Sequence, residues 1–206
     1  MRLSPRFEAA LVMATQLHAG QMRKGTEEQK RNGTEIPYVS HLLGVSSLVL
    51  EYGGSEDQAI AALLHDAVED QGGIETLDRI RDHFGSEVAE IVDHCTDAYE
   101  DPKPEWRQRK ETYVDEVPNM PATAALVSCA DKLHNARAIL SDLREVGDEL
   151  WGRFTGGKNG TRWYYSSLVE AFDDVEDFDE VFPNRLKDEL RRTVEEIEKL
   201  AQQSTA

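Results

Sequence analysis

The sequence predicts an all-α protein, a single domain of about eight to ten helices. Apolar residues recur at three- and four-residue steps along most of the chain, which is the period of an amphipathic helix. Glycines, prolines and capping residues interrupt this pattern, and no segment gives a convincing strand signal. A chain of 206 residues is long enough to bury a core within one domain.

Capping residues and apolar spacing define the first helices. Ser4 is a typical helix-capping residue, and Pro5 is favoured at the first helical position. Ser55 likewise precedes two acidic residues at the start of another helix. Paired glycines at 53–54 and 72–73 end the helices that precede them. We therefore expect helices at residues 5–17, 39–52, 55–70, 75–84 and 86–95, the last capped by Ser86.

The second half of the chain continues the helical pattern. A charged amphipathic segment follows the turn at 101–104, and Pro121 opens a long apolar run. The glycine-containing segments 25–37 and 147–160 are the two stretches that we expect to be irregular. We expect further helices at residues 105–117, 121–143, 161–175 and 184–203.

The chain is strongly acidic. It carries 23 Lys and Arg residues against 40 Asp and Glu residues, a net charge of −17. General binding to nucleic acid or to anionic membranes needs a basic surface, so we expect neither kind of partner. An anionic small substrate remains compatible, because it responds to the charge of a local pocket. The sequence leaves the oligomeric state open.

The cysteines and the apolar segments indicate a cytoplasmic location. Cys95 and Cys129 are too few for a disulfide framework, and both lie in apolar helical patterns typical of buried, reduced thiols. The N-terminus lacks an apolar signal segment. The longest charge-free apolar stretch, 119–130, is shorter than the ~20 residues of a membrane span.

One histidine has several ionisable neighbours. His65 is followed directly by Asp66, and Glu69 and Asp70 come one helical turn later, so His65 should stack on Glu69 and Asp66 on Asp70. The preceding residues are Ala-Ala-Leu-Leu. Ionisable groups beside such an apolar stretch need a compensating charge, which a divalent cation would supply.

Further ligands for a cation would come from other helices. His41 lies near the start of the preceding helix, and Asp131 interrupts an apolar run, with Asn135 four residues later. Imidazoles together with carboxylates suit Mn²⁺, Fe²⁺ or Zn²⁺ better than Ca²⁺ or Mg²⁺. On spacing alone the alternative stays open, that Asp131 faces solvent and His41 packs in the core.

Four segments of the sequence together resemble one family. They read HAGQMRK at 18–24, PYVSH at 37–41, ALLHDAVED at 62–70 and DKLHNAR at 131–137. Their residues, order and approximate spacing resemble the HD-domain metal-dependent phosphohydrolases, and most closely the alarmone hydrolases of the RelA/SpoT group with their small stand-alone members. The resemblance covers about residues 5–145. It implies one HD hydrolase domain over residues 1–206, with 146–206 as a C-terminal helical extension.

The resemblance also implies an activity and a set of site residues. The reaction is hydrolysis of the 3′-pyrophosphate of (p)ppGpp, which gives GDP or GTP and pyrophosphate. The usual ion is Mn²⁺, and another divalent transition metal would suit the same ligands. Carried over to this sequence, the metal ligands fall on His41, His65, Asp66 and Asp131, the catalytic carboxylates on Glu69 and Asp70, and the substrate contacts on Arg23, Lys24, Asn135 and Arg137.

Other residues of the same types have simpler interpretations. His18 and His134 fit the motifs as supporting residues rather than as ligands. The basic run 107–110 shares its helix with two glutamates and is expected to be a solvated face.

Two departures from the family pattern leave the substrate open. The link between Lys24 and Pro37 is longer than usual and should lie beside the base pocket, and the C-terminal third lies outside the motifs. Another nucleotide phosphate ester, such as a dNTP, a nucleoside monophosphate or NADPH, is therefore a second candidate substrate. A degenerate HD domain that only binds is a third possibility, which the complete ligand set and the intact carboxylate pair disfavour.

Overall fold

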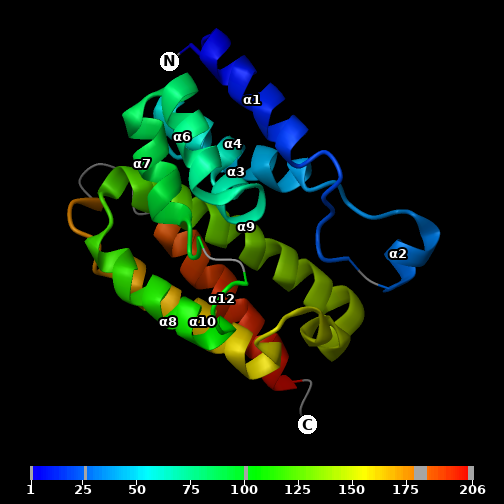
Figure 1. Cartoon of the computed structure of the whole chain (residues 1–206). Helices are drawn as coiled ribbons and strands as arrows, with labels where there is room; N and C mark the ends of the chain where they lie inside the picture. Colours follow the sequence, from blue (N-terminus) through cyan, green and yellow to red (C-terminus); the bar gives the residue numbers. More distant parts are fainter. Residues whose placement is uncertain (1, 26, 100–101, 179–184, 204–206) are drawn as a thin grey trace.

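The computed structural model describes residues 2–25, 27–99, 102–178 and 185–203. Within these residues every regular element is helical, apart from an isolated bridge between Met22 and Pro37, so the predicted all-α fold is confirmed (Figure 1). Among them, no helix combines the length and the apolar composition that a membrane crossing needs. The α-helices are α1 (Pro5–Leu17), α2 (Glu27–Asn32), α3 (Val39–Glu51), α4 (Glu56–Leu64), α5 (Ala67–Asp70), α6 (Gly73–Phe84), α7 (Ser86–Cys95), α8 (Trp106–Glu116), α9 (Ala122–Val146), α10 (Gly157–Asp173) and α12 (Arg185–Gln203), with 3₁₀ turns at Val117–Asn119 and Gly147–Arg153.

The expected caps explain where several helices begin. Ser4 accepts a hydrogen bond from the backbone N–H of Arg6 at the start of α1. Ser55 and Gln58 form a reciprocal capping box at the start of α4, with distances of 3.2 and 2.7 Å between side chain and backbone. At α7 the cap position is taken by Gly85 rather than by the expected Ser86, which is the first helical residue.

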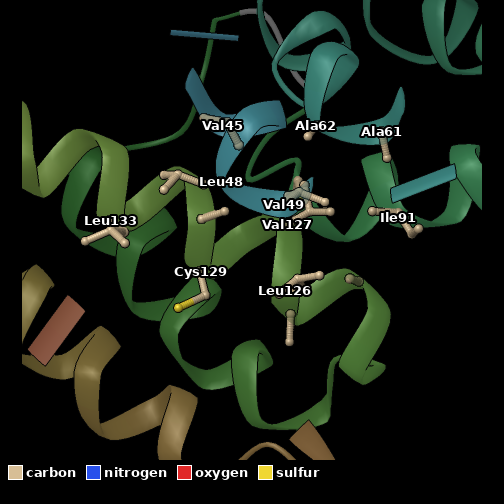
Figure 2. Close-up of a cluster of buried hydrophobic side chains, with 14 of the residues drawn as sticks. Val45, Leu48, Val49, Ala61, Ala62, Ile91, Leu126, Val127, Cys129 and Leu133 are labelled. Carbon is tan, nitrogen blue, oxygen red and sulfur yellow. The ribbon is translucent and has the colours of Figure 1, made fainter. Parts of the chain in front are cut away.

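Helix α9 runs through the middle of the molecule and packs against α3, α4, α7 and α12 (Figure 1). Figure 2 shows its apolar side chains meeting those of α3, α4 and α7 in the core. Every residue from Ala124 to Asp131 is buried, so this part of α9 is enclosed on all sides. The helix therefore carries the carboxylate of Asp131 into the interior rather than to the surface.

Two stretches expected to be irregular contain helices. Residues 25–37 include α2, and residues 147–160 include a 3₁₀ turn and the first residues of α10. In the second case Gly147 ends α9 with a positive φ, whereas two later glycines serve packing. A Cβ at Gly156 or Gly160 would come within contact distance of the Trp106 ring, so these glycines let α10 approach α8 closely.

The helix expected over 55–70 is interrupted. Helix α4 ends at Leu64, and α5 begins at Ala67, so that His65 and Asp66 lie at the junction between them. Asp66 is the cap residue of α5, and its carbonyl accepts the first helical hydrogen bond of α5 from the Asp70 N–H at 3.0 Å. Two of the four candidate metal ligands therefore lie where the helix is interrupted.

Candidate metal centre and active site

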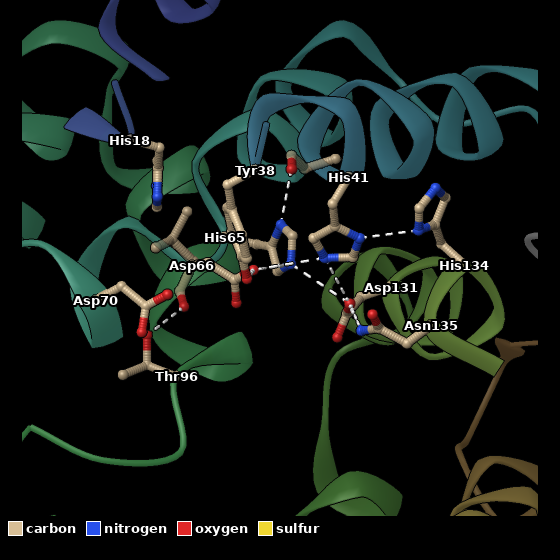
Figure 3. Close-up of polar contacts among 12 residues, drawn as sticks. His18, Tyr38, His41, His65, Asp66, Asp70, Thr96, Asp131, His134 and Asn135 are labelled. Carbon is tan, nitrogen blue, oxygen red and sulfur yellow. Dashed lines mark hydrogen bonds and ion pairs between the residues drawn. The ribbon is translucent and has the colours of Figure 1, made fainter. Parts of the chain in front are cut away.

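The structure brings together the four side chains that the sequence suggested as metal ligands. His41 comes from α3, His65 and Asp66 from the α4–α5 junction and Asp131 from α9 (Figure 3). His41 Nε2 lies 3.1 Å from Asp131 Oδ1 and 3.5 Å from Asp66 Oδ2. His65 Nε2 lies 3.0 Å from Asp66 Oδ2 and 3.5 Å from Asp131 Oδ1. Ligand atoms that surround one ion at about 2.0–2.2 Å have such separations.

The two ring nitrogens of His65, Nδ1 and Nε2, lie in different environments. Nδ1 lies 2.8 Å from the carbonyl oxygen of Ala62, and because a carbonyl only accepts, Nδ1 carries the proton. Nε2 is buried and has no hydrogen-bond partner among the described residues, although Asp66 Oδ2 is 3.0 Å away. A buried lone pair that faces carboxylates without a hydrogen bond fits a cation ligand.

His41 is held from behind by His134. The two Nδ1 atoms lie 2.9 Å apart, and burial together with His41 lowers the pKa of His134 to about 4. An unprotonated His134 can accept the Nδ1 proton of His41, which leaves His41 Nε2 for an ion. A Cβ at Gly44 would overlap the His134 ring, so the glycine provides the space for this contact.

The carboxylate of Asp66 is oriented by neighbours. The Tyr38 hydroxyl donates to Asp66 Oδ2 at 2.6 Å. Burial raises the pKa of a carboxyl, but the His65 ring outweighs burial and holds the pKa of Asp66 well below its usual range. Burial lowers the pKa of a histidine, yet Asp66 and Asp131 outweigh it and raise the pKa of His65. A metal ion would replace a proton at this site.

Asp131 is fixed by residues of its own helix. Lys132 Nζ lies 2.7 Å from Oδ2, and the Asn135 amide donates to Oδ1 at 2.6 Å. Burial would raise the pKa of Asp131, but the Lys132 ammonium outweighs it and holds that pKa well below the usual range. Asp131 is 5% exposed and His41 is 1% exposed, so Asp131 does not face solvent, and His41 is buried with its Nε2 toward the carboxylates.

The two carboxylates suggested as catalytic lie on α5, beside the ligand cluster. Because the chain breaks at His65, the expected stacking of Glu69 on His65 gives way to contacts with basic residues. Lys103 Nζ lies 2.7 Å from Glu69 Oε1 and 3.5 Å from Asp70 Oδ1, and Arg109 Nη1 lies 3.8 Å from Glu69 Oε1. Burial raises the pKa of Glu69, and the charge of Asp97 adds to this rise.

Three of the four suggested substrate contacts lie close to these groups. Arg23 Nη2 donates to Asn135 Oδ1 at 3.1 Å, which links Arg23 through Asn135 to Asp131. Lys24 lies over the Phe154 ring at 5.6 Å. Burial and the charge of Lys110 lower the pKa of Lys24, against the opposing charges of Asp70 and Glu69.

Arg137 is the exception among the suggested substrate contacts. Its guanidinium forms an ion pair with Glu189 of α12 at 3.2 Å. On α9 it is six residues beyond Asp131, which places it on another side of the helix. Among the described residues, no contact joins Arg137 to the histidine–aspartate cluster, so the structure does not bring it to the site.

Sequence reasoning missed several basic residues near the carboxylates. Within the run expected to be a solvated face, Arg109 Nη1 and Lys110 Nζ each lie 2.5 Å from a carboxylate oxygen of Asp97. Arg107 stacks on the Trp163 ring at 3.3 Å. The run therefore faces partly inward. Spacing could not reveal this, because each partner comes from a different element.

An all-α fold with two histidines and two aspartates gathered from three helical elements defines an HD domain. The HD domain family model matches residues 10–161, and the chain belongs to this family. The guanosine-3′,5′-bis(diphosphate) 3′-pyrophosphohydrolase MESH1 of Xenopus tropicalis is 36% identical over 146 residues, 70% of this chain and 75% of that protein. The human MESH1 is 37% identical over 131 residues, 63% of this chain and 68% of that protein.

Solved structures have the same fold. The structure of a metazoan ortholog of SpoT that hydrolyses ppGpp aligns with a TM-score of 0.71 and 24% identity, over 95% of this chain and 97% of that one. A Listeria monocytogenes EGD-e protein aligns with a TM-score of 0.66 and 31% identity, over 77% of this chain and 99% of that one. The chain is an HD domain related to the MESH1 and SpoT-type ppGpp hydrolases.

Proposed function

We propose that this protein is a Mn²⁺-dependent pyrophosphohydrolase that releases pyrophosphate from the 3′ position of (p)ppGpp. The observation that carries the proposal is the position of His65 Nε2, a buried ring nitrogen that has no hydrogen-bond partner among the described residues and lies 3.0 and 3.5 Å from two carboxylates. Such a site needs a cation, and the pyrophosphohydrolase activity for which the MESH1 relatives are named indicates the substrate class. In this proposal one HD hydrolase domain spans residues 1–206.

The metal would be held by four side chains, through Nε2 of His41 and His65 and through carboxylate oxygens of Asp66 and Asp131. Two imidazoles and two carboxylates favour a transition metal over Mg²⁺ or Ca²⁺, and Mn²⁺ accepts this mixed set. When bound, such an ion polarises a phosphoryl oxygen and lowers the pKa of a coordinated water.

The carboxylates of α5 would handle protons. Glu69 has a raised pKa because it is buried beside Asp97, and a base with a raised pKa takes a proton from an attacking water more effectively. Asp70, one residue on, would screen or protonate the leaving 3′ oxygen. Both residues follow Asp66 within about one helical turn, so they would lie beside a bound ion without serving as its ligands.

Local positive charge would hold the anionic substrate. The protein has a net charge of −17, yet Arg23, Lys103 and Arg109 contact residues of the candidate site, and the charges of Asp70 and Glu69 act on the pKa of Lys24. A tetra- or pentaphosphorylated nucleotide would meet this cluster rather than the acidic surface, because charge interactions are strongest at short range. Arg23 and Lys24 would contact the nucleotide, with Asn135 between Arg23 and Asp131.

A substrate panel tests this function. Protein stripped with a chelator and reloaded with Mn²⁺ is assayed on ppGpp, pppGpp, a dNTP, a nucleoside monophosphate and NADPH, with separate detection of phosphate and pyrophosphate. We expect pyrophosphate release from the two alarmones only with metal, and no release by the Asp66→Ala variant. Preferred turnover of NADPH or of a dNTP would assign the site to another phosphate ester. No turnover of any substrate would leave a binding module.

A further inference from the structure

Gln21 connects the loop after α1 to the carboxylate of Asp70. Its Nε2 donates to Asp70 Oδ2 at 2.7 Å. Its Oε1 accepts a hydrogen bond from Gln71 Nε2 at 2.8 Å and lies 2.7 Å from His18 Nδ1. A carboxylate only accepts, and the Nε2 of Gln71 only donates, so both ends of the Gln21 amide are assigned by their partners.

The backbone and the neighbours of Gln21 are also fixed. The Tyr38 N–H donates to the Gln21 carbonyl at 2.9 Å, beside the bridge between Met22 and Pro37. His18 is 3% exposed and stacks on the Tyr38 ring, with centroids 5.2 Å apart. The Gln21 side chain therefore extends from a fixed backbone position, with a buried ring directing its amide oxygen.

We propose that Gln21 is a positioning residue for Asp70, an inference that rests on the proposed function. The amide occupies Oδ2 and leaves Oδ1 for Lys103, whose Nζ lies 3.5 Å from it and 2.7 Å from Glu69 Oε1. On its outer side Asp70 borders an open hollow of about 360 Å³, which Gln21 also lines. Without the amide, the Asp70 carboxylate is free to turn toward water in this hollow.

The contact contributes orientation more than stability. The Gln21–Asp70 hydrogen bond is exposed to solvent, and water replaces such a bond at little cost in folding free energy. A reaction is more sensitive, because a misplacement of about 1 Å in a reacting group slows it strongly. Removal of the amide donor should therefore lower kcat without unfolding the protein.

A mutant cycle on kcat tests the proposal. Gln21→Glu keeps the side-chain length and an oxygen for both partners of Oε1, but it replaces the Nε2 donor. Gln21→Met removes both the amide oxygen and the amide nitrogen. We expect each to lower kcat for ppGpp by about tenfold, with KM and the Mn²⁺ dependence changed by less than about twofold. Gln16→Met, the same substitution at an exposed site on α1, is the matched control and should change neither constant.

The decisive comparison uses the Asp70→Ala background, measured by single turnover. If Gln21 acts through Asp70, Gln21→Met causes no further loss there, because the two effects are not additive. An equal loss of kcat in both backgrounds, or a change confined to KM, would overturn the proposal.

A second measurement does not depend on turnover. In the metal-free protein, the Nε2 proton resonances of Gln21 should shift on Asp70→Ala and stay unchanged on the distant Lys158→Met. If the Gln21 Nε2 resonances do not shift on Asp70→Ala, the contact between Gln21 and Asp70 is absent. If the contact is present but ppGpp is not hydrolysed, the proposed function fails instead, and the cycle is repeated on the ester that is turned over.

Discussion

Lys103 and Glu69 form an ion pair at the candidate site, with Nζ 2.7 Å from Oε1. Lys103 comes from the segment between α7 and α8, whereas Glu69 lies on α5 next to the ligand cluster. Burial and the charge of Asp97 raise the pKa of Glu69, and the Lys103 ammonium acts in the opposite direction. Lys103 therefore adjusts the protonation of the carboxylate that we propose as the base.

Removal of the Lys103 charge should change the pH dependence of the reaction. In Lys103→Met the pKa of Glu69 rises further, since an opposing positive charge is lost. Glu69 acts in its ionised form, so the acid limb of kcat against pH should move to higher pH. Lys158→Met, which removes a cation paired with Asp148, is the control and should leave the limb in place. An acid limb that is unchanged or moves to lower pH in Lys103→Met would contradict this effect of Lys103 on Glu69.

Substitutions of Glu69 and Asp131 should distinguish the catalytic base from a metal ligand. Glu69→Gln is expected to keep Mn²⁺ affinity and to lower kcat by about 10²–10⁴-fold, the usual scale for a general acid or base. Asp131→Asn is expected to weaken Mn²⁺ binding, because an amide is an uncharged and poorer ligand. Calorimetric Mn²⁺ titration beside single-turnover hydrolysis measures both effects. Lost metal affinity in Glu69→Gln, with full affinity in Asp131→Asn, would reverse the assignment.

A side chain at position 44 should weaken metal binding, because it would displace the His134 ring. A methyl group at Gly44 would overlap the His134 ring, which in turn contacts His41 at 2.9 Å. We expect Gly44→Ala to lower Mn²⁺ affinity by about 10- to 100-fold, as for other residues that orient a metal ligand. Gly152→Ala is the matched control, because a Cβ there meets nothing within 4 Å. Equal Mn²⁺ affinities of the two variants would show that His134 does not orient His41.

Arg23 and Arg137 should differ in their effect on substrate binding. Arg23 is linked through Asn135 to Asp131, whereas Arg137 pairs with Glu189 on α12. Arg23→Ala is expected to raise KM for ppGpp with little change in kcat, because it removes binding common to ground and transition states. Arg137→Ala should leave KM unchanged. A raised KM for Arg137→Ala would instead support the role that the family resemblance implies.

The all-α fold could be predicted because its signals are local, whereas the full set of four candidate ligands came from the family resemblance, since spacing alone left His41 and Asp131 open. Caps such as Ser4 and Ser55 are read from adjacent residues, and Asp131 stands out as a charge within an apolar run. The spacing also placed His65 and Asp66 at the end of an apolar helix. The break at their junction could not be read this way, because the apolar pattern continues beyond it into Ala67 and Val68.

The remaining features depend on residues that are distant in the sequence. Arg23 and Asn135 are 112 positions apart, and Lys103 and Glu69 are 34 apart, so no periodic pattern connects them. Gly156 lies in a segment expected to be irregular, yet it makes room for the Trp106 ring at the start of α10. A glycine pattern predicts backbone freedom but does not show which side chain fills the space.

In the proposed function, this site removes pyrophosphate from the 3′ position of the substrate in a reaction that needs a bound metal ion. The most direct test is product analysis of ppGpp incubated with the Mn²⁺-loaded protein, by anion-exchange chromatography and a pyrophosphate-coupled assay. We expect equal amounts of GDP and pyrophosphate, with neither formed by the His65→Ala variant or in the presence of a chelator. Release of single phosphates, or undiminished turnover by His65→Ala, would contradict it.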